Sequence, residues 1–331
     1  MADVTIAAPA SAPAETGSAD HSALHRTLFI ALAALLVVLP FIPVIGYPFF
    51  LMKVLCFALF ACAFNLMLGY GGLLSFGHAA YFGFASYVAA YTAKHWGLTP
   101  EVSILLGTAS GAALGLAFGS LAIRRQGIYF AMITLALAQM VYFFSLQAPR
   151  FTGGEDGIQA VPRNNLFGVL PLGNDTTTYY LVAVVFLAGV LLIYRIIHSP
   201  FGQVLKAIRD NEARAISLGY RVNQYKLAVF VLSASLAGLA GATKAIAVQL
   251  ASLTDVHWSM SGEVVLMTLV GGMGTVFGPI VGAAVIISMQ NFLAGLGAWV
   301  TVVQGVIFVI CVLVFREGIV GVIGKWLKKP L

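Results

Sequence analysis

The chain has 331 residues, of which 60% are hydrophobic and only 9% are charged. Because soluble domains carry about 25% charged residues, this composition excludes a water-soluble globular protein and predicts a polytopic membrane protein. The net charge of +6 does not indicate nucleic-acid binding, since the basic residues gather beside apolar runs, as they do in cytoplasmic loops that face an anionic leaflet.

The chain begins with residues 1–26, which are rich in Ala, Ser, Pro and Thr and have too few apolar side chains to form a core. We expect these residues to be a disordered cytoplasmic tail. Arg26 and the apolar run after it also fit a signal peptide. The run from Leu28 to Ile45 is long, however, and a retained first span fits it better.

An all-α membrane domain is predicted over residues 27–318. Ten apolar runs reach or approach the roughly 20 residues that cross a bilayer as a helix, which gives about eight to ten transmembrane segments: 28–45, 49–69, 79–94, 103–123, 127–147, 179–197, 226–250, 263–272, 275–294 and 299–315. The short run 263–272 is either a full crossing or a re-entrant half-helix. Within 103–123, Gly111, Gly115 and Gly119 form a ridge that lets a neighbouring helix approach closely.

Two glycine-rich interruptions, 69–78 and 271–279, each separate apolar segments in their own half of the chain. Paired breaks at corresponding positions indicate an internal repeat and a substrate pathway built from broken helices; two tight turns are the alternative. The helix amino ends at 75–78 and 275–278 are expected to face a substrate carboxylate. The candidate pathway residues are Ser75, Gly77, His78, Thr134, Gln139, Gly271, Gly272, Gly274 and Thr275.

Residues 199–226 form the longest strongly charged stretch, which lipid does not accommodate. Ser199 and Pro200 are a helix start, and apolar residues then follow at the spacing of one helix face. Asn211 is a cap for a second short helix, which Gly219 ends. We therefore predict two short helices outside the membrane. They lie on the lipid surface, dock into a partner or serve as a solvated connector.

The Lys/Arg bias sets the orientation of the spans. The charged stretch, the turn at Arg124 and Arg125 and the basic tail over residues 319–331 all belong in the cytoplasm. This requires an even number of spans between them and places both termini inside. The ten runs satisfy the requirement, and they place the 147–178 connection on the outer side of the membrane.

Several different short motifs are spread between about residue 30 and residue 318: NLMLGYGG (65–72), SFGHAA (75–80), GIYFAMITL (127–135), TGGEDG (152–157), KAIRDNE (206–212), YKL (225–227), AGLAG (237–241) and GGMGT (271–275). Together they resemble the permease subunits of high-affinity branched-chain amino acid ABC transporters, and they are nearer the M-type than the H-type subunit. ABC permeases often carry an EAAxxxG pattern in their coupling loop. Here only Ala215 and Gly219 match that pattern, and Arg214 stands where it has alanine.

The resemblance implies that residues 199–225 are the coupling loop, seated in a cleft of an ABC ATPase subunit. It also implies a second, H-type permease subunit and an extracytoplasmic solute-binding protein, in the lipid bilayer of a bacterial inner membrane. The expected ATPase contacts are Phe201, Val204, Lys206, Ile208, Arg209, Asp210, Asn211, Glu212, Arg214, Ala215 and Gly219. The expected binding-protein contacts are Thr152, Gly153, Gly154, Glu155 and Asp156.

The chain has no nucleotide-binding motif, because Gly318–Lys325 lacks the glycine spacing and the Ser/Thr of a phosphate loop. We therefore predict that it is not an enzyme and holds no cofactor, with ATP and Mg bound by the partner ATPase subunits. The three cysteines lack the spacing of metal ligands, so no metal site is expected.

Few ionisable residues fall within the predicted spans. Lys244 is expected to lie near the outer interface and to snorkel there. No acidic residue is predicted in mid-span, which argues against a proton-coupled carrier and favours a neutral or zwitterionic solute. Two alternatives to an amino-acid importer are the same machinery carrying urea or short amides, and a secondary carrier that needs no ATPase.

Overall fold

The computed structural model describes residues 27, 29–41, 47–168, 171–297, 299–314 and 318–326. The predicted tail over residues 1–26 lies outside them. In chain order, with η marking a short 3₁₀ or π helix, the elements are a helix over Phe29–Val38, η1 (Leu39–Phe41), α2 (Pro48–Asn65), η2 (Leu66–Tyr70), α3 (His78–His95), α4 (Pro100–Ala122), α5 (Ile128–Gln147), α6 (Pro149–Thr152), η3 (Gly154–Asp156), β1 (Ile158–Gln159), α7 (Asp175–His198), α8 (Pro200–Asp210), α9 (Glu212–Ser217), α10 (Val222–Val248), β2 (Leu250–Ala251), η4 (Leu253–Asp255), α11 (Trp258–Gly271), α12 (Gly278–Leu293), η5 (Ala294–Leu296), α13 (Trp299–Val314) and α14 (Gly318–Trp326).

The predicted all-α membrane fold is confirmed. Within the described part of the chain, five helices are long and apolar enough to cross a bilayer: α2 with η2, α4, α5, α7 and α10. Each of the ten predicted runs overlaps a described helix. The eighth segment is short, as expected, but it begins at Trp258 instead of residue 263. At 1.5 Å per residue, α11 and α12 are about 21 and 24 Å long, less than the roughly 30 Å of the hydrocarbon core.

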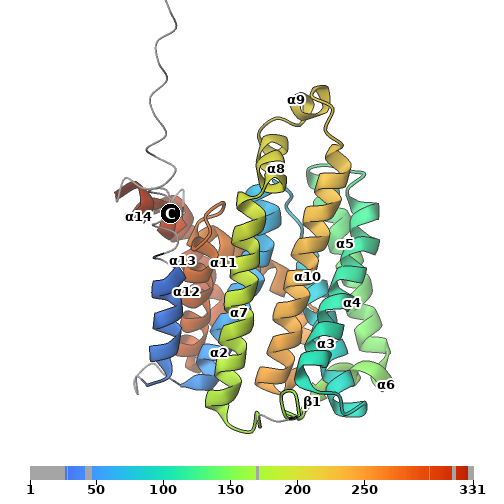
Figure 1. The fold of residues 1–331 in the computed structure, drawn as a ribbon, viewed down its shortest axis with the longest axis vertical. Coiled ribbons are helices and arrows are strands. Elements are labelled where there is room, and N and C mark those ends of the chain that lie inside the picture. The colour runs from blue at the N-terminus through green and yellow to red at the C-terminus, as the bar shows by residue number, and fades with distance from the viewer. Residues whose placement is uncertain are drawn as a thin grey trace, which may run out of the picture.

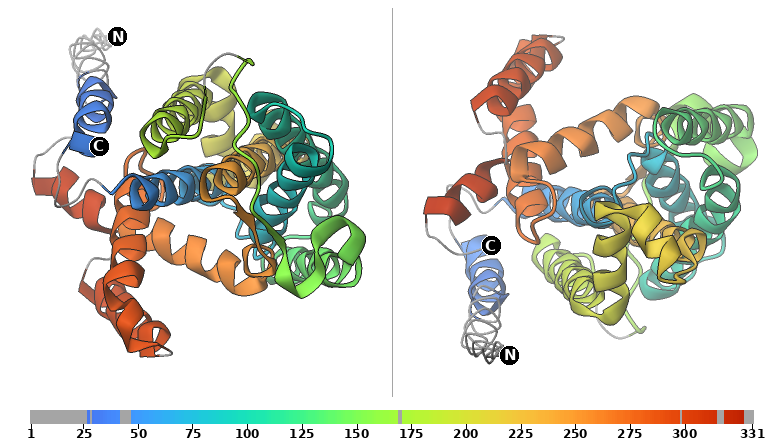
Figure 2. Two further views of the ribbon diagram at one scale, coloured as in Figure 1. Left: turned by 90° about the horizontal axis from the view of Figure 1, so that it is seen from below. Right: turned by 90° about the horizontal axis from the view of Figure 1, so that it is seen from above.

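The helices pack around α2 and α10, which run through the middle of the bundle with α3, α4 and α5 on one side and α12 and α13 on the other (Figure 2). The glycine ridge of α4 makes the closest of these contacts possible. A side chain at Gly111 would lie 3.0 Å from the Cα of Gly238 in α10, and one at Gly115 would collide with Ala234. The predicted close approach of a second helix is therefore confirmed, and its partner is α10.

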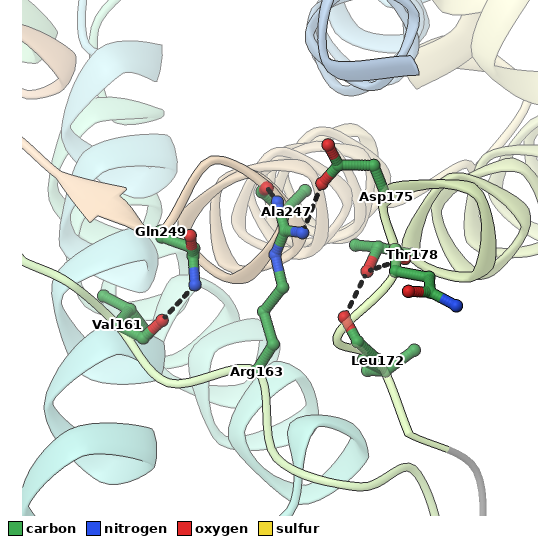
Figure 3. Close-up of polar contacts among 8 residues, drawn as sticks. Val161, Arg163, Leu172, Asp175, Thr178, Ala247 and Gln249 are labelled. Atoms are coloured by element: carbon green, nitrogen blue, oxygen red, sulfur yellow. Dashed lines mark hydrogen bonds and ion pairs between the residues drawn. The ribbon is translucent and has the colours of Figure 1, made fainter.

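The charged 199–225 segment and the 147–178 connection lie at opposite ends of the bundle. Helices α8 and α9 of the former project from one end, and β1 of the latter lies at the other (Figure 1). At the β1 end, the connection between α5 and α7 is fastened to the end of α10. β1 pairs antiparallel with β2, and Arg163 binds both the Asp175 carboxylate (2.6 Å) and the carbonyl of Ala247 (Figure 3). Gln249 donates to the carbonyl of Val161 (3.2 Å). The connection is thus a folded cap on the bundle.

Part of the predicted basic tail over residues 319–331 is helical. Residues 318–326 form α14, which packs against α11 and α12, and both Gly318 and Val320 are buried. Ile319 packs against the main hydrophobic core and Val320 is buried, so this segment gains apolar burial by forming a helix. The remainder of the predicted tail, residues 327–331, lies outside the described residues.

Candidate functional site

The 199–225 segment folds as its sequence predicts, because each helix end has a local signal. The hydroxyl of Ser199 accepts a hydrogen bond from the amide of Gly202 (3.4 Å), with Pro200 at the first position of α8. Asn211 accepts from the amide of Arg214 (3.0 Å) and so caps α9. Gly219, with φ +86°, ends this helix in the left-handed region that glycine adopts at little cost.

The apolar face of α8 is used inside the segment. Ile208, Ala215 and Val222 are buried in a small cluster that joins α8, α9 and the start of α10. Phe201 stacks on Tyr225 with ring centroids 5.5 Å apart. Ile208 and Ala215, which were expected to touch an ATPase, therefore do not reach the surface. The two short helices instead share a core of their own.

Glu212 is also committed to the segment itself. Its carboxylate accepts from the ammonium of Lys226 (2.8 Å) and from the amide of Gln126 (3.0 Å), which follows α4. Lys226 is buried, so this ion pair is better shielded from water than a surface pair. Glu212 therefore braces α9 against α10 and the turn between α4 and α5.

Two basic residues of α8 point toward the bundle. The ammonium of Lys206 lies over the ring of Tyr70, 5.6 Å from its centroid. The guanidinium of Arg209 donates to the carbonyl of Gly69 and also pairs with Asp210 (3.2 Å). Both contacts reach η2, so α8 is attached to the first glycine break as well as to α7.

The exposed end of the segment carries apolar residues that the sequence reasoning missed. Ile216, Leu218 and Tyr220, which we call the apolar tip, are 59%, 70% and 41% exposed. Of the predicted contacts, Arg209, Asp210, Asn211, Arg214 and Gly219 are exposed too. Large apolar groups that project into water away from a membrane surface are typical of an interface. A signal was present in the sequence: Ile216 and Leu218 are large apolar residues within the charged stretch.

The two glycine breaks meet each other. Residues 66–70 are wound as a π-helix, and the 272–277 turn lies against them. The side-chain amide of Asn65 accepts a hydrogen bond from the backbone nitrogen of Gly274 (2.9 Å) and donates one to the carbonyl of Thr275 (2.8 Å). Asn65, which the sequence reasoning did not select, thus joins the first break to Gly274 and Thr275 of the second.

Several backbone amides at the amino ends in these breaks are bound to hydroxyl groups. The amide of Phe76 donates to the hydroxyl of Thr134 (3.2 Å), and that of Ala79 donates to the hydroxyl of Ser261 (3.0 Å). At the second break, Thr275 accepts from the amide of Gly278 (3.0 Å). That these ends receive a substrate carboxylate stays a prediction, and these three amides are bound to hydroxyls in this structure. The hydroxyls of Thr134 and Thr275 therefore support the backbone of the two breaks.

The other pathway candidates are distributed around the breaks. Ser75 accepts from the amide of Gly77 (3.1 Å), and Gly77 packs on Thr134. His78 is buried among aromatic rings and bonds to Ser233 (2.9 Å). The close approach of Gly271 to Gly278 leaves no room for a side chain, Gly272 has φ +121°, and Gln139 is half-buried on α5.

An apolar pocket of about 480 Å³ adjoins the first break, lined by Gly72, Leu73, Phe76, Ile128, Met132 and Leu135 among others. None of the candidate pathway residues lines it.

At the other end of the bundle, the TGGEDG turn is built from glycines with positive φ. Thr152 is fully buried and donates to the carbonyls of Ser145 and Ala148, and Gly154 is also buried. These two residues support the turn and do not present a surface to a binding protein. Gly153, Glu155 and Asp156 are exposed and remain predictions.

Some charged side chains that were expected at the membrane surface or outside the spans are buried inside the protein. Lys244 does not snorkel: it forms an ion pair with Asp255 (2.6 Å), and both side chains are buried. Glu263 lies within α11, half-buried, and accepts from Gln290 (3.1 Å). Because α11 begins five residues earlier than predicted, an acidic residue does lie inside an apolar helix. This finding removes one argument against a proton-coupled carrier.

These features define a multi-pass membrane protein with two glycine-broken segments. Its helices α8 and α9, which we call the arm, project beyond the bundle and are attached to the first of these segments. Residues 47–312 match the family described as branched-chain amino acid transport system / permease component, and the chain belongs to this family. The resemblance seen in the motifs is confirmed.

Relatives extend the match over most of the chain. The high-affinity branched-chain amino acid transport system permease protein LivM of Salmonella typhimurium is 25% identical over 332 residues, covering 93% of this chain and 78% of that protein. LivM of Escherichia coli gives the same values. The ribose import permease protein RbsC of Escherichia coli is 28% identical over 230 residues, covering 65% of this chain and 70% of its own length. No solved structure matches. All three of these relatives are named permease proteins.

Proposed function

We propose that the chain is the transmembrane permease subunit of an ABC importer that carries branched-chain or other apolar amino acids across a bacterial inner membrane. Partner ATPase subunits bind ATP and Mg and hydrolyse the nucleotide. A second, H-type permease subunit completes the membrane unit, and an extracytoplasmic binding protein delivers the substrate. Residues 199–225 and both termini are then cytoplasmic, and β1 lies on the outer side.

The observation that carries this proposal is the apolar tip on an internally braced arm. The shared core of α8 and α9 and the carboxylate of Glu212 hold the arm together, so force applied to the tip moves it as one body. Ile216 and Leu218 are the groups that a partner's cleft would bury. An arm of this kind serves a transporter driven by a separate ATPase better than a secondary carrier, which needs no such partner.

The experiment is reconstitution with the candidate ATPases, the second permease and the binding protein. Leu218→Asp places a carboxylate in the docking surface. It should abolish ATPase association and ATP-driven uptake while the subunit still accumulates in the membrane. Gln203→Asp, which adds the same charge at an exposed position of α8, is the matched control. Uptake by this chain alone, driven by an ion gradient, would instead support a secondary carrier.

A sugar is the second candidate substrate, because ribose permeases are among the relatives. Substrate identity is tested on the partner binding protein by identifying the ligand that it holds after purification. A branched-chain amino acid supports the proposal. A pentose, or urea or another short amide, would assign the same machinery to a different solute.

A further inference from the structure

Three segments that are far apart in the sequence meet where α8 touches the bundle. Arg209 donates from Nη1 to the carbonyl of Gly69, and its aliphatic stem covers Gly72, where an added Cβ would lie 2.8 Å from Arg209 Cγ. Gly69 lies in the last turn of η2, where helix carbonyls lack partners and a cation is favourable. With Lys206 above Tyr70, α8 holds the end of this turn at two points.

The second link runs from η2 to the 272–277 turn through Asn65. Its side chain exchanges two hydrogen bonds with the backbone of Gly274 and Thr275, at 2.9 and 2.8 Å, as a neighbouring strand would. Asn65 is 2% exposed, so neither bond competes with water. A buried amide with both ends satisfied fixes the relative position of the two glycine breaks.

The backbones at this place are too close for any residue but glycine. A Cβ at Gly69 would lie 2.6 Å from the backbone nitrogen of Gly274, and Gly274 itself has φ +78°. Gly274 also lies beside the guanidinium of Arg209, since its Cβ position is 3.9 Å from Nη1. The π-helical winding of residues 66–70 belongs to the same contact, and such turns are frequent at functional sites.

We propose that Arg209 and Asn65 form a junction through which movement of α8 reaches both glycine breaks at once. The inference rests on the proposed function and adds a route to it. Besides the covalent connections to α7 and α10, displacement of α8 pulls on Gly69 through Arg209, and Asn65 passes that displacement to Gly274 and Thr275. Both residues are positioning residues: Arg209 acts inward on the permease and not on the ATPase.

The test measures substrate transported per ATP hydrolysed in the complete reconstituted importer. Arg209→Met removes the donors but keeps the length of the side chain, and Asn65→Leu keeps the volume but removes both bonds. Each variant should still associate with the ATPase and retain at least half of the ATP hydrolysis rate. Each should lower the substrate transported per ATP hydrolysed at least tenfold. Arg209→Lys, which retains one donor, should recover part of the ratio. The double variant should lower the ratio no further than the worse single variant does, because both substitutions interrupt the same connection.

A second readout follows the breaks themselves. Leu74 lies in the first break and is 38% exposed, so a cysteine there is open to a labelling reagent. In a background without the native cysteines, the labelling rate of Leu74→Cys should change with nucleotide, and Arg209→Met should abolish that change. Arg209 is exposed enough for its variant to fold even if Asn65→Leu does not accumulate. If Leu218→Asp fails to impair ATPase association, the proposed function fails. If Leu218→Asp acts as expected while Arg209→Met keeps the wild-type ratio and labelling change, the junction is refuted.

Discussion

Truncation of Leu218 should weaken binding to the ATPase without destabilising the subunit. Its side chain is 70% exposed, so truncation should change the stability of the isolated subunit by no more than about 0.5 kcal/mol. Burying a whole leucine contributes about 1.5–3 kcal/mol, so burying the exposed 70% in an ATPase cleft contributes about 1–2 kcal/mol. Leu218→Ala should therefore weaken ATPase binding about 5- to 30-fold.

The assay pairs two measurements on the subunit in lipid nanodiscs: the affinity for the ATPase and the thermal unfolding midpoint. Leu191→Ala is the matched control, because Leu191 is 57% exposed but belongs to the apolar membrane helix α7 and not to the arm. The reasoning is wrong if Leu218→Ala binds as tightly as the wild type, if Leu191→Ala weakens binding equally, or if Leu218→Ala lowers the unfolding midpoint.

Three further predictions concern stability, each measured by unfolding in nanodiscs. Asp255→Ala leaves the buried charge of Lys244 unpaired and should cost about 3–5 kcal/mol; replacing both residues by apolar ones should restore most of the loss. Gly219→Ala should cost about 1–2 kcal/mol because of the positive φ, whereas Gly219→Asn, which tolerates that conformation, should cost less. Gly115→Ala should cost about 1–3 kcal/mol because the new methyl collides with α10; an unchanged midpoint would show that α4 and α10 separate freely.

Local signals made the helices and the two caps of the 199–225 segment predictable. Ser199, Pro200 and Asn211 act within four residues of their own positions, and such short-range signals can be read from a sequence. Hydrophobic length likewise located the membrane helices, because the bilayer fixes how many apolar residues a crossing needs. The same reasoning set the start of α11 at residue 263, which is too late, because Ser259, Ser261 and Gly262 interrupt the apolar pattern but not the helix.

The partners of polar side chains were not predictable, because they lie far away in the chain. Arg209 is 140 positions from Gly69, and Asn65 is 209 positions from Gly274. A basic residue in a charged stretch was assigned to an external partner for lack of any sequence signal for an internal one. The buried pair of Lys244 and Asp255 was missed for a related reason: a short loop after α10 turns back onto that helix, and periodicity says nothing about loops.

The structure also explains why the segment matches the wider EAAxxxG pattern at only two positions. Ala215 is buried against Ile208 and Val222, so a larger side chain would separate α8 from α9. Gly219 needs its positive φ to end α9. Both positions serve the folding of the arm itself, whatever partner it meets. Arg214 is exposed and contributes only its backbone amide to the cap, so its side chain is free to suit a particular ATPase. The pattern therefore separates into residues that build the arm and residues that choose its partner.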